Sequence, residues 1–348
     1  LAVLMFTSGT SGRPRGAMLT HRALLANLDQ CQRLEPSPMH PDDVVLLVLP
    51  LFHIYGLNTG LGMVAATAAT GLLVERFDPV ATLELVRSHG VTNIPAAPTM
   101  YVAWTRGASL DALRDVRMLE SGSAPLPPSV LEQVREEAGV TIYEGYGLTE
   151  TAPVVATTLA SARVKPGSVG RPVPGVEVKL CDEDGAEVEE DDTGEVWVRG
   201  DNLFSGYWPD GADGPGEDGW WRTGDVAYAD EDGDLFLVDR RKELVLVSGF
   251  NVYPREVEDV LAQHPGVLEA AVIAVPDPYT GEAVKAFVVP RPGTTLDAAD
   301  VVAHTASRLA RFKRPTQVEV VDALPHSATG KVAKGRLRED LEEVGEPE

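Results

Sequence analysis

Apolar residues recur with two different spacings along the first part of the chain. Val44–Leu49 is an unbroken apolar run, which is typical of a strand buried on both faces. Pro79–His89 instead places Val80, Leu83 and Val86 on one side of a helix. The same criteria predict strands at Asn93–Ala97, Val116–Glu120 and Val140–Tyr143 and a helix at Pro128–Ala138. Strands separated by helices predict a largely parallel sheet with helices on both faces.

The pattern changes between residues 166 and 239. Short strands predicted at Val176–Leu180, Gly194–Arg199 and Leu235–Val238 are separated by turns rich in glycine and aspartate. This spacing is typical of antiparallel structure. The turn Asp182–Asp192 is dense in acidic residues, so we expect a solvated hairpin there.

A third pattern begins at residue 240. We expect helices at Pro254–Gln263 and Ala298–Leu309 and strands at Ala270–Val275 and Ala283–Val289, which together make a small α+β unit. Charge supports a boundary here, because residues 1–239 hold 16 basic and 36 acidic residues, whereas residues 240–348 hold 14 and 17. The sequence therefore predicts a larger domain at 1–239 and a smaller one at 240–348.

The total charge narrows the classes of partner. The 348 residues carry a formal net charge of −23, and such an acid excess would repel the phosphates of a nucleic acid. The uncharged run Val44–Val74 is interrupted by Pro50 and several glycines, so we interpret it as a buried strand, a turn and an internal helix, not as a membrane span. Cys31 and Cys181 have no metal-binding spacing and fit a reducing compartment. We expect a cytoplasmic protein, with peripheral membrane association as an alternative.

The segment Thr7–Gly16 has the composition of an anion-binding loop. Its glycines allow several backbone N–H groups to point into one concavity, and its hydroxyls add donors that suit phosphate oxygens. It is not a Walker A loop, because no Gly-Lys-Ser/Thr sequence follows at the required spacing. The alternative is a flexible linker, which we do not expect between an apolar strand and a helical run that begins near Thr20.

This segment resembles the phosphate loop of the adenylate-forming (ANL) superfamily, which includes acyl-CoA synthetases, adenylation domains and luciferases, with Arg15 where the family usually has lysine. Seven further segments resemble motifs of the same superfamily in the same order. They are Pro50–Gly56, Ser121–Leu126, Gly145–Glu150, Trp221–Asp225, Asp239–Lys242, Ser248–Pro254 and Thr329–Lys331. Within these, Pro50–Gly56 and Phe250–Pro254 are most similar to bacterial long-chain fatty acid–CoA ligases.

The resemblance implies a two-domain fold. It implies a large α/β N-terminal domain, built of parallel sheets with helices and a small β-barrel-like part, and then a small mobile α+β C-terminal domain. The chain opens at Leu1 directly with an apolar run, so we expect it to lack the N-terminal part of the large domain.

The resemblance also implies a site for ATP and AMP. In this interpretation Tyr146 stacks on adenine, Glu144 accepts from the adenine amino group, and Asp225 accepts from the ribose hydroxyls. A packed core tyrosine is the alternative for Tyr146. The full set is Thr7, Ser8, Gly9, Thr10, Ser11, Gly12, Arg15, Ser123, Ala124, Pro125, Glu144, Gly145, Tyr146, Gly147, Thr149, Asp225 and Arg240.

The catalytic residues that the resemblance implies are Lys331, Thr149, Glu150 and His53. Lys331 would bridge the attacking carboxylate and the α-phosphate, Thr149 would donate to that phosphate, and Glu150 would bind Mg²⁺, which prefers oxygen ligands. A packed histidine is the alternative for His53. The acyl pocket would be lined by His53, Gly122, Gly147, Pro153 and Val154.

For a second half-reaction the resemblance implies a hinge at Lys242 and a CoA channel at Ser248, Gly249 and Phe250. Gly249 would suit the channel because a missing side chain permits close approach. ATP, Mg²⁺ and CoA are therefore the expected cofactors or co-substrates. A separate acyl carrier protein as acceptor has no support from the residues.

The sequence thus predicts an ATP-dependent, AMP-forming acyl-CoA ligase that activates a carboxylic acid, expected to be a fatty acid, as an acyl-adenylate and transfers it to CoA. One alternative is an aryl acid–CoA ligase of the coumarate type. The other is a catalytically incomplete nucleotide-binding fragment. The sequence contains no GxSxG elbow, HExxH pair or clustered Cys/His set, which leaves serine hydrolases and zinc enzymes without support.

Overall fold

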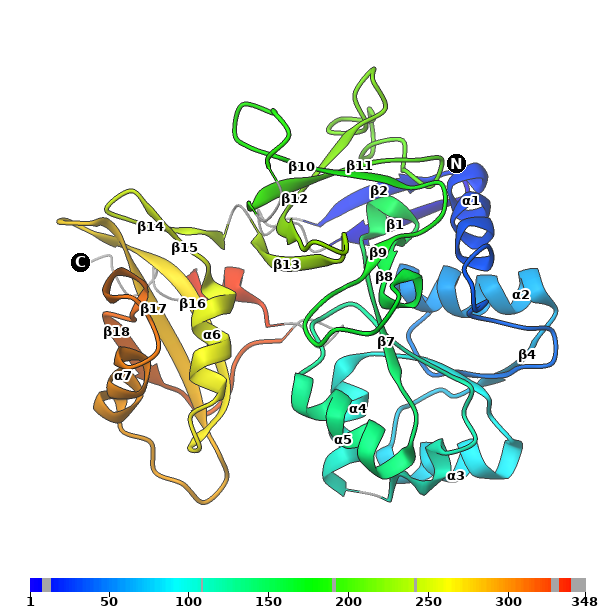
Figure 1. The fold of residues 1–348 in the computed structure, drawn as a ribbon, viewed down its shortest axis with the longest axis horizontal. Helices are drawn as coiled ribbons and strands as arrows, with labels where there is room; N and C mark the ends of the chain where they lie inside the picture. The colour runs from blue at the N-terminus through cyan, green and yellow to red at the C-terminus, as the bar shows by residue number, and fades with distance from the viewer. Residues whose placement is uncertain (8–13, 108, 190–191, 241–242, 327–331, 339–348) are drawn as a thin grey trace. The chain divides into compact units, whose positions relative to one another are not determined.

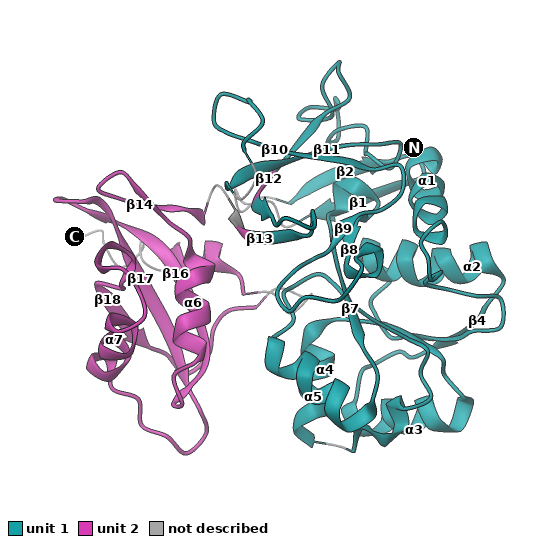
Figure 2. Cartoon of the chain, in the orientation of Figure 1, with its two compact units in different colours: residues 1–9, 13–223, 227–237 teal, residues 10–12, 224–226, 238–348 magenta. Residues whose placement is uncertain are grey.

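The chain divides into two compact units (Figure 2). Within the residues described, unit 1 holds 1–7, 14–223 and 227–237, and unit 2 holds 224–226 and the residues from 238 onward. The domain limits expected from the sequence stay a prediction, since compactness alone does not show that the parts fold or move independently. The computed structural model describes residues 1–7, 14–107, 109–189, 192–240, 243–326 and 332–338.

A seven-stranded sheet forms the centre of unit 1 (Figure 1). Neighbouring strands from β4 to β7 run parallel, and β8 and β9 are antiparallel to the strands before them. The four strands predicted for this part of the chain are confirmed, with small shifts at their ends. In order across the sheet the strands are β4 (Thr70–Leu73), β3 (Val44–Leu47), β5 (Asn93–Ala96), β6 (Met118–Ser121), β7 (Ile142–Gly147), β8 (Val154–Thr157) and β9 (Arg171–Pro172).

Helices cover both faces of the parallel part of this sheet. Leu46 of β3 packs with α3 (Pro79–His89), α4 (Pro98–Gly107) and α5 (Pro128–Ala138). Its neighbours Val45 and Leu47 pack instead with α1 (His21–Gln32) and α2 (Met63–Thr67). Successive side chains of a strand point to opposite faces, so the unbroken apolar run fits a strand with both faces covered. The predicted α/β fold is confirmed.

Helix α3 begins and ends where the sequence predicts, but its buried side differs. The Asp78 side chain caps the helix by accepting from the backbone N–H of Val80 at 3.0 Å. Leu83, Val86 and also Thr82 are buried, whereas Val80 is 53% exposed. The prediction that Val80 shares the buried face was wrong. At about 3.6 residues per turn the buried stripe is centred near Val86, and Val80 in the first turn lies beyond its edge.

The uncharged run at 44–74 is confirmed as a strand followed by internal helical structure. A π-helix, η1 (Tyr55–Gly62), continues into α2, and β4 follows. The residue spacing did not indicate the π-type hydrogen bonding. No helix in the described part of the chain is long and apolar enough to span a membrane.

Paired strands lie on either side of the segment expected to bind phosphate. β1 (Val3–Thr7) and β2 (Arg15–Leu19) run antiparallel, with Thr7 opposite Arg15. The expectation that Thr7, Arg15 and Gly16 belong to the loop was therefore wrong, because strand pairing includes all three. Thr20 then caps α1 by accepting from the backbone N–H of Ala23 at 3.0 Å.

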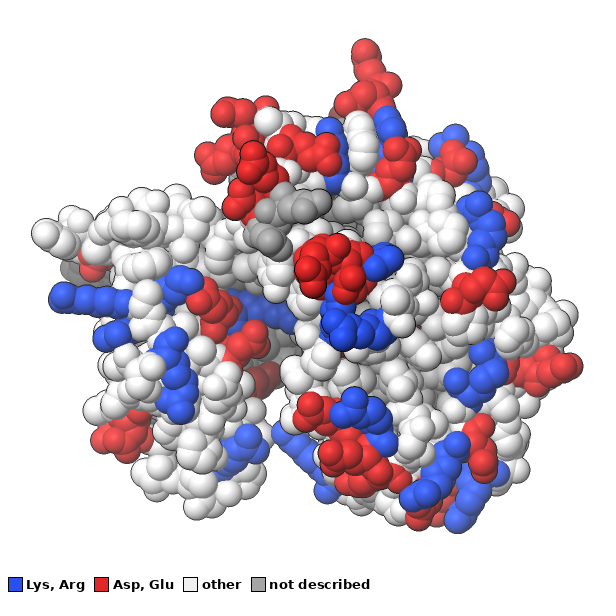
Figure 3. Space-filling view, in the orientation of Figure 1, with Lys and Arg blue, Asp and Glu red and all other residues white. Residues whose placement is uncertain are grey.

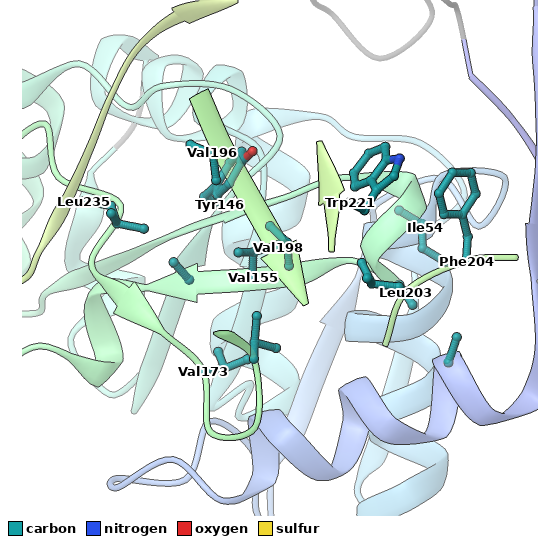
Figure 4. Close-up of a cluster of buried hydrophobic side chains, with 14 of the residues drawn as sticks. Ile54, Tyr146, Val155, Val173, Val196, Val198, Leu203, Phe204, Trp221 and Leu235 are labelled. Atoms are coloured by element: carbon teal, nitrogen blue, oxygen red, sulfur yellow. The ribbon is translucent and has the colours of Figure 1, made fainter. Parts of the chain in front are cut away.

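A second sheet, mostly in unit 1, confirms the predicted antiparallel hairpin. β10 and β11 run antiparallel, and the acidic turn at 182–192 joins them. Figure 3 shows acidic side chains gathered over this hairpin. Apolar side chains of this sheet pack with those of β7 and β8 in one core. This core includes Tyr146, Val155 and Val196 (Figure 4). The strand order is β10 (Glu177–Cys181), β11 (Gly194–Arg199), β12 (Trp221–Ala229) and β13 (Leu235–Arg240).

Unit 2 is a small α+β body, as predicted. Helices α6 (Pro254–Ala262) and α7 (Ala298–Ala306) contribute Val257 and Val301 to a core with Val272 of the sheet. The sheet order is β15 (Phe250–Val252), β14 (Val245–Val247), β17 (Gly281–Pro290) and β16 (Val267–Asp277), with β18 (Gln317–Val320) also paired to β17. Single 3₁₀ turns across the two units are η2 (Leu110–Leu113), η3 (Thr149–Thr151), η4 (Thr158–Ala160) and η6 (Arg311–Lys313).

Replacing Leu83 by alanine removes a buried side chain from the core beneath α3. We expect Leu83→Ala to lower the free energy of unfolding by about 2–5 kcal/mol, the usual range for such a truncation. The matched control Val80→Ala, on the exposed side of the same helix, should change it by less than about 0.5 kcal/mol. Urea denaturation followed by circular dichroism measures both. Equal losses in the two variants would contradict the observed buried face.

Candidate functional site

The carboxyl end of β6 lies beside the middle of β7 in unit 1. Ser121 pairs with Glu144 across these two strands, and β7 is also the strand at which the sheet changes from parallel to antiparallel. In open α/β sheets, ligands characteristically bind just beyond the carboxyl ends of the strands. Many of the residues predicted to bind adenine and phosphate follow or end these two strands.

The Glu144 side chain ties β7 to the segment that follows β6. It is buried, and its Oε2 accepts a hydrogen bond from the backbone N–H of Leu126 at 3.1 Å. This bond anchors the turn Ser123–Pro125, in which Ala124 and Pro125 are exposed. The sequence predicted that Glu144 accepts from an adenine amino group. The carboxylate also has a structural partner, and its contact with adenine stays a prediction.

Tyr146 is more deeply packed than the predicted stacking on adenine requires. It is 7% exposed and belongs to the same core as Val155 and Val196 (Figure 4). This packing matches the alternative of a core tyrosine, and stacking on adenine stays a prediction. At the adjacent Gly147, a Cβ would lie 2.0 Å from the carbonyl oxygen of Pro153, so the close approach of that chain segment requires glycine.

Thr149 and Glu150 lie in the 3₁₀ turn η3, directly after β7. Thr149 is half-buried, and Glu150 is buried with its Oε1 accepting from the hydroxyl of Tyr207 at 2.6 Å. A buried carboxylate needs such a donor, because an unpaired buried charge is costly. The Tyr207 hydroxyl is a donor at neutral pH, as tyrosine ordinarily is, and burial together with Glu150 raises its pKa further. Nothing in the sequence pattern singled out Tyr207.

Each backbone carbonyl from residue 150 to 154 has a separate hydrogen-bond donor. Two donors are backbone N–H groups and three are side-chain amides. In order along the turn they are Phe204 N–H (2.9 Å), Asn202 Nδ2 (2.8 Å), Asn58 Nδ2 (2.7 Å), Leu148 N–H (3.1 Å) and Asn27 Nδ2 (2.8 Å). The segment 150–154, which begins with Glu150, is therefore held from several directions at once.

The three asparagines are site residues that the sequence did not indicate. Asn27 of α1, Asn58 of η1 and Asn202 after β11 are between 0% and 4% exposed. Asn27 also accepts from the backbone N–H of Val154 at 3.0 Å, so its amide bonds this residue in both directions. Asparagine is usually exposed, and these three lie far apart in the chain, so no local pattern connects them. The polar Asn58 inside an uncharged run was the one available signal.

Arg15 of β2 lies beside the same turn. Its Nη2 donates to Asp213 at 2.6 Å, and its guanidinium lies 3.6 Å from the centroid of the Tyr207 ring. A planar guanidinium stacks on an aromatic face better than an ammonium does. The Tyr207 ring therefore gives a structural reason for arginine at position 15, where the family usually has lysine. The other predicted phosphate-loop residue of these strands, Thr7, is half-buried. The predictions for Ser8, Gly9, Thr10, Ser11 and Gly12 lie outside the described residues.

Two residues predicted for the acyl pocket come together around Tyr55. His53 is half-buried, and its Nδ1 accepts from the backbone N–H of Tyr55 at 3.2 Å. The Tyr55 ring covers Gly122, where a Cβ would lie 3.1 Å from a ring carbon. Pro153 and Val154 belong to the segment whose carbonyls the amides hold. The pocket itself stays a prediction.

The structure describes only some of the residues predicted to bind ribose, to form the hinge or to act as the catalytic lysine. Asp225 lies in β12 and is 7% exposed. Arg240 ends β13, but its side chain is not described. The hinge at Lys242 and the catalytic Lys331 fall outside the described residues, so both stay predictions.

The predicted CoA-channel segment forms a tight turn between β14 and β15. Val247 pairs with Phe250, and the two residues between them, Ser248 and Gly249, have φ values of 52° and 83°. Positive φ at both positions is characteristic of a type I′ hairpin turn, so backbone conformation by itself favours glycine at 249. Phe250 is 59% exposed, and the centroid of its ring lies 4.9 Å from that of Phe312.

Backbone strain marks several of these segments. The described non-glycine residues with positive φ are Ala68, Ser123, Ala152, Asp213 and Ser248. Ser123 begins the predicted adenine turn, Ala152 follows Glu150 by two residues, and Asp213 binds Arg15. Such conformations persist where surrounding structure enforces them, and they cluster at functional sites.

Glu150 and Thr149 are the best placed predicted residues for a magnesium ion. Mg²⁺ takes oxygen ligands and is commonly held by one or two carboxylates together with substrate phosphates. Glu150 supplies a buried carboxylate with a fixed orientation, and Thr149 supplies a hydroxyl next to it. The donor set therefore fits the ion.

A second group of acids in the described residues already holds a cation of the chain itself. Asp230, Asp232 and Asp234, in the turn between β12 and β13, are close enough to share an ion. The Nζ of Lys165 lies 2.6, 2.6 and 2.8 Å from their carboxylates. Although burial opposes it, hydrogen bonding to these aspartates raises the pKa of Lys165. The ammonium group fills the place of a metal ion.

Two cavities in unit 1 are lined by other residues than those predicted for the site. One of about 430 Å³ is lined by residues that include Arg22, Arg199 and Phe204, and one of about 510 Å³ is lined by residues that include Arg135 and Arg163. Neither is lined by a residue predicted to bind ATP or the acyl group.

Comparison with known proteins identifies the family. Residues 1–208 match the family described as AMP-binding enzyme, and residues 256–331 match its C-terminal domain. The chain belongs to the AMP-binding enzyme family. The resemblance to the adenylate-forming superfamily is thereby confirmed.

Relatives of this chain include CoA ligases. It is 37% identical to the long-chain-fatty-acid–CoA ligase of Bacillus subtilis (strain 168), over 98% of the chain and 62% of that relative. It is also 37% identical to the indoleacetate–CoA ligase of Aromatoleum aromaticum, over 97% of the chain and 66% of that relative. The structure of ATP-bound MatB from Rhodopseudomonas palustris matches with a TM-score of 0.93 and 35% identity, covering 99% of the chain and 69% of MatB. The chain thus spans 62% to 69% of these proteins.

Glu120 of β6 is a half-buried acid of this chain that the sequence analysis did not select. Burial raises its pKa to about 7, with Arg117 partly opposing the effect and Asp43 adding to it. Its backbone carbonyl accepts from the hydroxyl of Tyr101 at 2.9 Å. An acid inside an apolar strand was the signal in the sequence. Its position one residue before Ser121 places a titratable group near the candidate site.

Glu120→Gln should change how stability depends on pH. The carboxyl group keeps its proton more tightly when folded, with a pKa of about 7 against 4.5, so its contribution to stability falls as pH rises between those values. We therefore compare the free energy of unfolding of Glu120→Gln with that of the wild type at each pH. The difference should favour the variant more at pH 8 than at pH 4.5. Urea unfolding at both pH values measures this, with the exposed Glu136→Gln as control. Parallel pH profiles for the wild type and Glu120→Gln would refute the expectation.

Proposed function

We propose that this protein is an ATP-dependent, AMP-forming acyl-CoA ligase. The observation that carries the proposal is the turn at 149–154. Its buried Glu150 carboxylate is held by the Tyr207 hydroxyl, and the Tyr207 ring stacks against Arg15. The Thr149 hydroxyl lies next to Glu150 in sequence. These are group types that bind phosphates and a magnesium ion. The family assignment and the CoA ligase activities named for two relatives support the reaction type.

In the first half-reaction a carboxylate oxygen of the substrate attacks the α-phosphorus of ATP. The bond to the bridging oxygen breaks, and pyrophosphate leaves with its electron pair, which produces the acyl-adenylate. Thr149 donates to the α-phosphate and Lys331 stabilises the charge that develops there. Asp225 accepts from the ribose hydroxyls. When bound at Glu150, Mg²⁺ supplies positive charge that neutralises the phosphates.

In the second half-reaction the CoA thiolate attacks the acyl carbonyl carbon. The bond to the phosphate oxygen breaks, AMP leaves, and the acyl-CoA thioester remains. The turn at Ser248–Phe250 lines the path of the pantetheine chain, and Lys242 serves as the hinge between the two steps. Catalysis in both steps consists mainly of positioning and of electrostatic stabilisation.

A fatty acid is the substrate class that we favour. The predicted pocket residues Gly122, Pro153 and Val154 present no charge, and His53 next to Tyr55 offers a donor for the carboxyl end. An aryl acid is the second candidate, which the relationship to an indoleacetate–CoA ligase favours.

A pyrophosphate-release assay tests the proposal. The protein is incubated with ATP and Mg²⁺ and with fatty acids of varied chain length, aryl acids or amino acids, each with and without CoA. We expect pyrophosphate with fatty acids and a thioester only when CoA is present. Preference for aryl acids would select the second candidate. Saturation by amino acids without CoA would refute acyl-CoA ligation, and no release with any acid would indicate a catalytically incomplete chain.

Lys331→Ala should separate the two half-reactions. A cation aimed at developing negative charge typically contributes about 10²–10³ in rate, so we expect a loss of that size in acyl-adenylate formation. Thioester formation from supplied acyl-adenylate should persist. Lys313→Ala serves as a control, since Lys313 pairs with Glu256 at 2.7 Å within unit 2. Equal losses in both half-reactions would rule out the assigned role of Lys331.

A further inference from the structure

The segment that follows β11 is fastened to two parts of the candidate site. On one side, the backbone N–H of Trp208 donates to the carbonyl of Gly16 in β2 at 2.8 Å. On the other side, the backbone N–H of Phe204 donates to the carbonyl of Glu150 at 2.9 Å. The residues between these two bonds are therefore held close to both strand β2 and the turn that carries Glu150.

Tyr207 lies inside this segment, and its side chain contacts both parts. Its hydroxyl donates to Oε1 of Glu150 at 2.6 Å, and its ring lies under the guanidinium of Arg15 at 3.6 Å. The ring also packs edge-on against Phe204, with centroids 5.0 Å apart. Arg15 is held from its other side by Asp213 at 2.6 Å. One aromatic side chain thus contacts a cation of one segment and an anion of another.

We propose that Tyr207 is a positioning residue, whose hydroxyl orients the Glu150 carboxylate for a divalent cation and whose ring orients Arg15 for the nucleotide phosphates. This inference rests on the proposed function, because it gives Glu150 and Arg15 their partners. It adds a residue that the resemblance to the family did not assign.

The two halves of the Tyr207 side chain act on different groups. The hydroxyl fixes one carboxylate oxygen of Glu150, which sets the direction of the other. Groups that orient a metal ligand in this way commonly change metal affinity by about 10–100-fold when removed. The ring acts on Arg15 alone, through its face. Substitutions that remove the hydroxyl or the whole ring should therefore have different effects.

Tyr207→Phe removes the hydroxyl and keeps the ring. We test it by electron paramagnetic resonance titration of Mn²⁺ in the presence of α,β-methylene-ATP, which reports metal binding without turnover. We expect Mn²⁺ to bind about 10–100-fold more weakly than to the wild type. Binding of the nucleotide analogue in EDTA should be unchanged. Tyr279→Phe is the matched control, because Tyr279 is 94% exposed, and it should alter neither value.

Tyr207→Leu removes the ring as well. It should weaken Mn²⁺ binding as Tyr207→Phe does and should also weaken binding of the analogue in EDTA. Arg15→Lys, which keeps the charge but not the planar stacking group, should weaken only the binding of the analogue in EDTA. This second variant keeps the ring contribution testable even if Tyr207→Leu does not fold.

A double variant separates positioning from a merely structural role. If the hydroxyl acts through the carboxylate, Tyr207→Phe combined with Glu150→Gln should bind Mn²⁺ no more weakly than Glu150→Gln alone. Additive losses, or wild-type Mn²⁺ affinity in Tyr207→Phe, would overturn the inference. Failure of the proposed function has a different signature, in which the wild type itself takes up no Mn²⁺ with the analogue.

Discussion

The hydrogen bonding of the turn from Glu150 to Val154 is the constraint on which the candidate site depends. Leaving a buried carbonyl unpaired costs about 1–3 kcal/mol, and regular helix or sheet pairing does not satisfy most of these. Donors from α1, η1 and the segment after β11 therefore have to converge on the turn. The same convergence brings Tyr207 to Glu150. The backbone requirement thus also determines the surroundings of the carboxylate.

The acidic character of the chain is compatible with a site for polyanions, because the nearby acids have partners. Glu144 accepts from a backbone N–H and Glu150 from the Tyr207 hydroxyl. Asp213 is paired with Arg15. Many of the remaining acids are exposed, as on the β10–β11 hairpin in Figure 3. The net charge therefore affects which large partners the whole surface attracts or repels. Binding of a polyanion at the site depends instead on a few oriented donors and cations.

Local patterns predicted most of the regular elements, and the errors have different causes. The limits of α3 and α5 match the structure, since capping and helical spacing are local. The strand β2 was missed because its pairing partner β1 lies across a glycine-rich segment that obscures the pattern. The exposure of Val80 was missed because the centre of a buried stripe depends on what packs against the helix. The first error arises from strand pairing and the second from tertiary packing, and residue spacing by itself reports neither.

The sequence by itself determined the fold class, the family and the order of the site motifs. Residue spacing reports which faces are apolar, and short motifs such as Gly145–Glu150 preserve their residue types in one stretch of chain. Only the tertiary structure decided that Asn27, Asn58 and Asn202 hold the turn and that Tyr207 joins Arg15 to Glu150. Hydrogen bonds and ring contacts act over a few ångströms in space, so residues far apart in the chain reveal them only after folding.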